Sequence, residues 1–303
     1  MDRRPSRSLG SPSPWATASP IEVLIDAGIG NQMFQYAIGR SLCIRTGRPL
    51  VLDISPLFLE PGWGFDLACF RLGQQRVRNL PYAVWRVRRK LLRVLVSLGV
   101  ELKRFVEESG LQFSEEVLRI RKACILHGYW QSERYFESIS DQLREEFTFI
   151  GEQDPRSAAC QASIRRAKSI GLHVRRADYA TPDGNAYHGT CPKSYYDAAL
   201  ELVLSRLGAD AELFVFSDDM DWTRENIRYA LPTTYVDWNS RRSYEDLRLM
   251  SSCRALIMAN SSFSWWGGWL IPGPDKVVVA PRQWYRAPGV ISDLPDSSWL
   301  TAI

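Results

Sequence analysis

The segment GLHVRRADY at 171–179 contains two adjacent arginines and a nearby carboxylate, side chains that could bind a ligand or take part in a reaction. Arg175 and Arg176 follow a short apolar run, and Asp178 comes next but one. A guanidinium group offers a planar fork of donors that matches the edge of a phosphate. At the carboxyl end of a strand in an α/β sheet, such a pair would lie where ligands normally bind. A surface cluster of salt bridges is the alternative, and this segment alone does not separate the two.

A second buried strand ends in polar residues, in the segment FVFSDD at 214–219. Asp218 and Asp219 could hold a metal ion, or they could accept hydrogen bonds from the N–H groups of a guanine edge. Capping of the following helix by Asp219 is a third interpretation, and it is compatible with the others.

A third strand is followed by small hydroxyl residues and tryptophans, NSSFSWWGGW at 260–269. Residues of this kind at the start of a helix leave backbone N–H groups available, and these favour a phosphate. We predict that Trp265 and Trp266 belong to the core rather than to a binding surface. The candidate ligand contacts in this segment are Asn260, Ser261, Ser262, Phe263 and Ser264.

The segment GIGNQ at 28–32 lies between a strand and a helix and suggests a nucleotide-binding turn. The dinucleotide fingerprint requires a third glycine three residues after Gly30, and Met33 stands there, which disfavours an NAD-dependent oxidoreductase. Gly30 still permits a close approach of the backbone, and Asn31 and Gln32 could hydrogen-bond sugar hydroxyls. A structural tight turn is the alternative.

Alternating strands and helices must position these segments, and this alternation predicts an α/β fold with a mostly parallel sheet in each half. We expect a disordered extension over 1–19, a first domain over 20–150 and a second over 151–303, with a linker at 151–156. Ser243 and Asp246 form an N-terminal capping signal for a helix. The predicted strands are 21–25, 50–52, 123–126, 170–174, 213–216, 234–236, 256–259 and 276–279; the predicted helices are 31–45, 193–207, 222–229, 244–251 and 264–270.

Composition limits the classes of function. A net charge of +4 over 303 residues is too small to argue for nucleic acid, although it suits a ligand that carries phosphate. Six scattered cysteines predict reduced thiols in a cytosolic protein, and three unpaired histidines argue against a zinc site. The first nineteen residues, rich in Ser, Pro and Arg, lack the apolar region of a signal peptide. No run of eighteen apolar residues predicts a membrane span.

A basic stretch over 82–105 has the period of an amphipathic helix. Such a helix could rest on an anionic membrane surface, or it could be an ordinary helix with a solvated charged face. Its apolar face is predicted to carry Val84, Val87, Leu91, Val94, Leu95, Leu98 and Leu102, with Arg86, Arg89, Lys90 and Arg93 opposite.

Taken together, seven segments in one order resemble bacterial α-1,2-fucosyltransferases, glycosyltransferase family 11. They cover most of the chain from Gly28 to Trp284, and Ala177 is a departure, because the family usually has glycine there. The matching segments are GIGNQMFQYAIGR at 28–40, GYWQSERYF at 128–136, HVRRADY at 173–179, YHGTCPKSYYDAAL at 187–200, FVFSDD at 214–219, SYEDLRLMSSC at 243–253 and ANSSFSWWGGWL at 259–270.

The resemblance implies a GT-B fold, in which two Rossmann-like domains face each other and the second holds the donor. It implies GDP-fucose as donor and the 2-hydroxyl of a galactoside as acceptor. It also implies inversion at the anomeric carbon of fucose and a reaction that requires neither metal nor cofactor. Arg175 would contact the β-phosphate as the catalytic group. His173, Arg176 and Asp178 would line the donor site, with Ser217, Asp218 and Asp219 near the nucleoside. The segment 260–264 would cradle the diphosphate, and Gly30, Asn31 and Gln32 would shape the acceptor side.

The catalytic base stays open, with Asp26 and His188 as candidates by residue type only. A protein or other-linkage fucosyltransferase and a catalytically silent nucleotide-sugar-binding module remain alternatives. We expect a bacterial-type cytoplasmic location, peripheral on the inner membrane face, where the enzyme would modify a surface glycan on a lipid carrier. The sequence does not identify that glycan.

Overall fold

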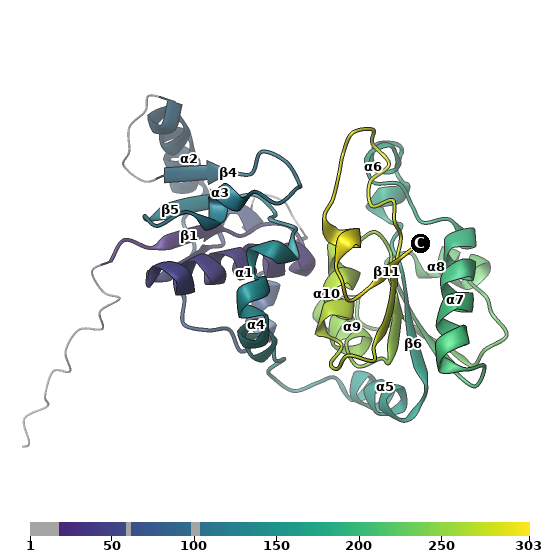
Figure 1. Ribbon diagram of the computed structural model, residues 1–303. Coiled ribbons are helices and arrows are strands. Elements are labelled where there is room, and N and C mark those ends of the chain that lie inside the picture. The colour runs from purple at the N-terminus through teal and green to yellow at the C-terminus, as the bar shows by residue number, and fades with distance from the viewer. Residues whose placement is uncertain (1–17, 59–61, 98–103, 241) are drawn as a thin grey trace, which may run out of the picture.

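The computed structural model describes residues 18–58, 62–97, 104–240 and 242–303 (Figure 1). It contains two parallel sheets, each covered by helices, and the first sheet precedes the second in the chain. This confirms the predicted α/β fold class. Nearly all of the predicted N-terminal extension, residues 1–17, lies outside the described residues.

The first sheet has five strands in the order β3-β2-β1-β5-β4, and every neighbouring pair is parallel. The three central strands were predicted, and their residues are almost all buried, as expected for a parallel sheet. The two edge strands were not predicted, because both are short and rich in charged residues. The bounds are β1 (Ile21–Leu24), β2 (Leu50–Asp53), β3 (Arg76–Arg78), β4 (Arg104–Glu107) and β5 (Cys124–His127).

The second sheet has six strands in the order β11-β10-β9-β6-β7-β8, again all parallel. All five strands predicted for this half are present, and β11 is an additional edge strand of two residues. The bounds are β6 (Ser169–Val174), β7 (Glu212–Ser217), β8 (Thr233–Val236), β9 (Ala255–Ile257), β10 (Val277–Ala280) and β11 (Thr301–Ala302).

Apart from the basic helix, the helices agree with the predicted ones to within a few residues at their ends, and several more are present. One of these, α5, starts inside the predicted linker, where Asp154 accepts hydrogen bonds from the backbone N–H groups of Arg156 and Ser157. The helices are α1 (Ile29–Thr46), α2 (Tyr82–Ser97), α3 (Glu115–Leu118), α4 (Ser140–Glu146), α5 (Pro155–Arg166), α6 (Pro182–Tyr187), α7 (Lys193–Leu207), α8 (Met220–Asn226), α9 (Ser243–Met250) and α10 (Ser262–Leu270), with 3₁₀ turns at Ser55–Phe58, Asp66–Cys69, Glu133–Tyr135, Glu137–Ile139, Asp178–Ala180 and Leu294–Asp296.

The two domains meet where α10 packs against α1 (Figure 1). The rings of Phe34 and Trp266 lie 4.8 Å apart, and Trp266 stacks on Phe136 at 5.3 Å. Trp265 and Trp266 are fully buried, which confirms that they belong to the core. One continuous apolar cluster therefore includes residues of both domains.

The basic helix differs from its prediction in length and in orientation. α2 ends at Ser97, residues 98–103 lie outside the described part, and Phe105 belongs to strand β4. Trp85 is buried, and Arg88 forms ion pairs with the buried carboxylates of Glu22 and Asp53. The helix is thus attached by an aromatic and a charged side chain. Of its predicted apolar residues, Val84, Val87, Leu91 and Val94 are exposed, while Leu98 and Leu102 lie outside the described residues.

Candidate active site

A cleft of about 560 Å³ lies between the domains, at the carboxyl ends of the parallel strands. Nine of the predicted site residues line it, together with His188, one of the two candidate bases. The structure therefore brings together most of the segments singled out in the sequence. The nine are Gly30, Asn31, Arg175, Asp178, Ser217, Asp218, Ser261, Ser262 and Phe263.

Arg175 is held between two carboxylates at this edge. Because β6 pairs with β7 so that Val174 lies opposite Ser217, the next residues, Arg175 and Asp218, are neighbours. Nη1 of Arg175 lies 2.9 Å from Oδ2 of Asp218, and Nη2 lies 2.6 Å from Oδ1 of Asp178. Its Nε is buried and has no hydrogen-bond partner among the described residues. A guanidinium fixed in this way can serve a phosphate without first being ordered.

Asp218 also fixes the backbone that follows β6. Its Oδ1 accepts hydrogen bonds from the backbone N–H groups of Arg176, at 2.8 Å, and Ala177, at 3.3 Å. One carboxylate thus orients both the loop and the arginine side chain. The family that this sequence resembles usually has glycine at position 177. The methyl group of Ala177 leaves these two hydrogen bonds intact.

The amino end of α10 enters the cleft beside Arg175. Ser261 is its N-cap residue and makes no side-chain capping bond within the part of the chain that the structure describes. First-turn N–H groups without a cap, reinforced by the helix dipole, attract an anion. A guanidinium and a helix N-terminus therefore border one cavity.

Asn31 joins the two sides of the cleft. Its Oδ1 accepts hydrogen bonds from Oγ of Ser262, at 2.9 Å, and from Nε2 of Gln131, at 2.7 Å. Gly30 is equally important, because a β-carbon there would lie 2.6 Å from the backbone nitrogen of Phe263. The glycine of the predicted tight turn thus serves the approach of α1 to α10.

Three predicted contacts lie outside the cleft, with their polar groups bonded inside the protein. Gln32 is fully buried and donates to the carbonyl groups of Ala27 and Gly64, both at 2.8 Å. Nδ2 of Asn260, with its two hydrogens, lies 3.0–3.1 Å from three backbone carbonyl oxygens, and Oγ of Ser264, with its single hydrogen, lies 3.2–3.3 Å from two. In the structure these three side chains hold turns and do not line the cleft.

His173, Arg176 and Asp219 lie behind the cleft wall. Burial, together with the charge of Arg175, lowers the pKa of His173 to about 3, so the imidazole is neutral. Arg176 stacks 3.8 Å above the Trp222 ring and pairs with Asp219 at 3.2 Å. Asp219 also accepts from the backbone of Trp222, which confirms the capping of α8. These three residues support the wall rather than line it.

Apart from Phe263 and the candidate base His188, the aromatic residues of the cleft were not predicted from the sequence. His188 stacks on Tyr179 with ring centres 4.1 Å apart, and Tyr285 donates to Gln131 at 3.4 Å. Burial is the main cause that lowers the pKa of His188, so its neutral form is favoured. Aromatic side chains are as common in cores as in sugar sites, which is why residue type gave no signal. The aromatic lining comprises Trp63, Tyr129, Tyr179, Tyr187, Phe263, Trp284 and Tyr285.

A polar corner of the cleft was also missed, at Asn239, Ser240, Ser243 and Asp246. Asp246 accepts a hydrogen bond from Nδ2 of Asn239 at 2.8 Å, and burial raises its pKa to about 7. Ser243 is the first residue of α9, and the N-cap position is taken by Arg242, which makes no side-chain capping bond in the described structure. The predicted capping pair is therefore wrong, and Asp246 faces the cleft instead.

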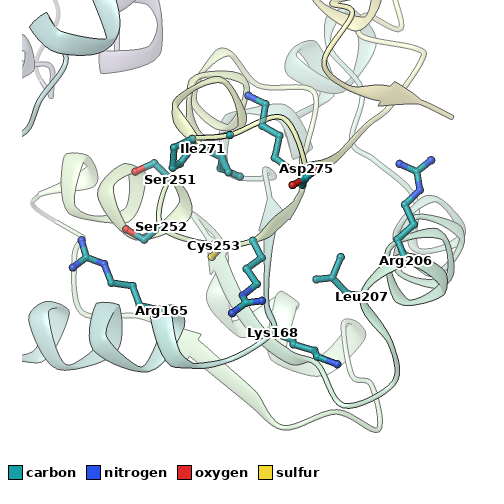
Figure 2. A pocket seen from close by; sticks show the side chains of 13 residues that line it. Arg165, Lys168, Arg206, Leu207, Ser251, Ser252, Cys253, Ile271 and Asp275 are labelled. Carbon is teal, nitrogen blue, oxygen red and sulfur yellow. The ribbon is translucent and has the colours of Figure 1, made fainter.

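Two further observations concern other kinds of site. No group of three or more His, Cys, Asp or Glu side chains in the described ranges is arranged to hold a metal ion. A larger cavity, of about 670 Å³, lies at the start of β6, β9 and β10 (Figure 2). The charged ends of Lys168 and Arg206 point away from each other there. Ligands of parallel sheets bind at the opposite edge, so the interdomain cleft is the candidate site.

The amino-acid sequence of this chain is similar to those of known glycosyltransferases. The family model described as Glycosyl transferase family 11 matches residues 94–299. An O-antigen biosynthesis glycosyltransferase, WbnK, of Escherichia coli is 32% identical over 91% of this chain and 98% of its own length. An α-1,2-colitosyltransferase of the same species is 31% identical over 86% of this chain and 90% of its own length. A galactoside α-(1,2)-fucosyltransferase of Leontocebus fuscicollis is 26% identical over 91% of this chain and 69% of its own length.

Among solved structures, the fucosyltransferase NodZ from Bradyrhizobium matches with a TM-score of 0.51. It is 15% identical to this chain, and the match covers 84% of this chain and 94% of NodZ. At this identity the likeness concerns the fold alone. It agrees with the predicted GT-B arrangement of two parallel-sheet domains.

Proposed function

We propose that this chain, which belongs to glycosyltransferase family 11, transfers L-fucose from GDP-fucose to the 2-hydroxyl group of a galactoside, with inversion at the fucose carbon. The observation that carries this proposal is the position of Arg175 at the strand end, beside the amino end of α10 in one interdomain cleft. Both features suit the diphosphate of a nucleotide sugar.

The chemistry follows from where charge develops. When the bond between fucose and phosphate breaks, negative charge accumulates on the leaving GDP. Fixed cations and N–H dipoles stabilise such charge best when they need no rearrangement during the reaction. Arg175, held by Asp178 and Asp218, supplies the cation, and the first turn of α10 supplies the dipoles. Asp218 and the polar corner at Asp246 are the candidate partners of the nucleoside.

The acceptor hydroxyl must lose a proton, and the cleft favours one of the two candidate bases. His188 lines the main cleft, and its lowered pKa keeps the imidazole able to accept a proton near neutrality. Asp26 lies in a neighbouring hollow, bonded to Nε2 of Gln35 at 2.8 Å. We therefore assign the role of base to His188.

The donor sugar has a second candidate, colitose. The colitosyltransferase relative is more similar to this chain than the galactoside fucosyltransferase is, at 31% against 26% identity. The shared α-1,2 linkage in both names supports the proposed linkage. The name of the WbnK relative supports a surface polysaccharide as the destination of the sugar.

Metal independence belongs to the same proposal. Arg175 and the α10 N-terminus can neutralise a diphosphate without Mg²⁺, and Asp218 is engaged with Arg175 and with backbone N–H groups. The carboxylates of this edge therefore have structural partners already. The proposed reaction consumes GDP-fucose as a co-substrate and requires no cofactor.

A lipid-linked glycan is the proposed form of the acceptor, reached at the inner face of a membrane. No helix in the described ranges is long and apolar enough to span a bilayer. α2 exposes Val84, Val87 and Leu91, while Arg86 and Lys90 are exposed beside them. An apolar strip next to basic side chains suits the interface of an anionic bilayer. Equal binding to neutral and anionic vesicles would count against this contact.

One experiment tests the function directly. Purified protein is incubated with GDP-fucose and a panel of galactose-terminated oligosaccharides, and the product linkage is determined by NMR. An α-1,2-linked product supports the proposal. GDP-colitose in parallel separates the two donors, and a peptide acceptor tests protein fucosylation. GDP binding without transfer or donor hydrolysis would indicate a silent binding module.

A further inference from the structure

A second hollow, of about 230 Å³, opens beside the main cleft in the first domain. The two share Ala27, Trp63 and Tyr129 as lining residues, so they adjoin along these side chains. The remaining walls come from the turn after β2, the end of β5 and the inner side of α2. The hollow therefore extends the acceptor side of the cleft and lies within the first domain, away from the diphosphate.

The walls combine exposed aromatic surface with charged groups. Trp63 and Tyr129 are 42% and 39% exposed, high values for large rings beside a cavity. Arg89 and Asp26 add a guanidinium and a carboxylate, and Arg89 lies over the ring of Trp85 at 5.2 Å. Flat aromatic faces pack on the C–H surface of a sugar ring, while charged groups bond its hydroxyls. One cation and one anion together suit an uncharged sugar.

The backbone that borders the hollow is strained at one residue, Ala27. Ala27 has φ of 59°, in the left-handed region that residues other than glycine rarely adopt. Gln32 holds this turn through the carbonyl of Ala27, and Gln35 bonds both the backbone N–H and the carboxylate of Asp26. Strain retained by such bonds is typical of a binding site.

The ring of Trp63 depends on the same turn. A β-carbon at Gly28 would lie 2.8 Å from the Trp63 ring, so the absence of a side chain at Gly28 lets the indole lie against the turn. The indole thus forms part of the boundary between the two cavities. A saccharide that leaves the main cleft at this point would pass along its face.

From these observations we infer that the second hollow binds the sugar that precedes the acceptor galactose, an uncharged pyranose such as a hexose or an N-acetylhexosamine. This inference rests on the proposed function, since it takes the galactose to occupy the main cleft. It adds that the enzyme selects its acceptor by the second sugar. The groups that distinguish that sugar are Arg89 and Asp26, which line only the second hollow.

The test compares Arg89→Gln with wild type on two acceptors, methyl β-galactoside and a disaccharide with galactose linked to N-acetylglucosamine. We expect kcat/KM for the disaccharide to fall about tenfold, the effect of losing a charge-assisted hydrogen bond. Transfer to the monosaccharide should stay within about twofold, since Arg89 does not line the main cleft. Arg45→Gln, an exposed arginine at the end of α1, is the matched control and should change neither.

A binding measurement separates failure of this inference from failure of the proposed function. Wild type and Arg89→Gln, each saturated with GDP, are titrated with both saccharides by calorimetry. Weaker disaccharide binding in the variant alone supports the subsite even if no transfer occurs. Equal losses with both saccharides, or no loss with the disaccharide, would overturn it. A protein that binds GDP and both saccharides but transfers nothing would refute only the proposed function.

Discussion

Arg175 and Asp218 form an ion pair between neighbouring strand ends, with Nη1 2.9 Å from Oδ2. The pair exists because β6 and β7 are parallel and in register at Val174 and Ser217. In the proposed function, an incoming diphosphate would meet a guanidinium that the register of the β-sheet has already oriented.

Replacing this guanidinium is the first test. Arg175→Ala should lower kcat by about a hundredfold or more, because a fixed donor to developing charge is lost. The fold should persist, since the side chain is a quarter exposed and lies at a cavity wall. Steady-state kinetics with GDP-fucose, together with the circular dichroism of the variant, measure both effects. Turnover like that of wild type would exclude the assigned role.

Removal of divalent metal is the second test. Transfer should continue at an unchanged rate in excess EDTA, since the α10 N-terminus and Arg175 supply the positive potential at the diphosphate. Initial rates with and without chelator, after dialysis, measure this. A loss of activity that Mn²⁺ restores would assign Asp218 and Asp219 to a metal site instead.

The contact between α1 and α10 predicts a stability effect at Gly30. A β-carbon there would meet the backbone of Phe263 at 2.6 Å, so Gly30→Ala should destabilise the protein by about 1–3 kcal/mol. Urea unfolding measures this loss. Gly64→Ala is the control, because its added carbon would lie 3.6 Å from its nearest neighbour, the side-chain Oδ1 of Asp66. Equal stability of both variants would contradict the close approach.

His173 predicts a pH dependence of stability. Its pKa in the folded protein, about 3, lies below the ordinary value of 6.5, so the unfolded chain binds a proton between these pH values that the native protein excludes. Stability from this group is full above pH 6.5 and is lost as the pH falls. Relative to His173→Gln, wild type should lose about 2 kcal/mol between pH 7 and pH 5. Urea unfolding at both values measures the difference, and parallel losses would contradict it.

The central strands and the motifs at their ends were predictable because apolar runs and turn residues are local signals. What residue type could not supply was the direction of a side chain. Gln32 and Asn260 carry amides that suit a sugar equally well, yet both bond backbone carbonyl groups instead. Their turns contain backbone carbonyl groups that regular secondary structure leaves without hydrogen-bond partners. Only the folded structure shows that these carbonyl groups need a side-chain donor.

The orientation of helix α2 was a second feature that the sequence could not predict. Its apolar period was read correctly, but periodicity cannot say which face meets the domain. The buried carboxylates of Glu22 and Asp53 attract Arg88, and this long-range pairing turns the apolar residues outward. The polar corner at Asp246 escaped notice for a similar reason, since Asn239 is its partner from a separate loop.

The aromatic contact of Phe34 and Phe136 with Trp265 and Trp266 has a mechanical consequence. Swinging the domains apart as rigid bodies would bring these rings into water and break the bond from the Trp266 indole to the carbonyl of Gly30. These contacts therefore hold the two domains in one relative position. Both domains should thus unfold together in a single thermal transition.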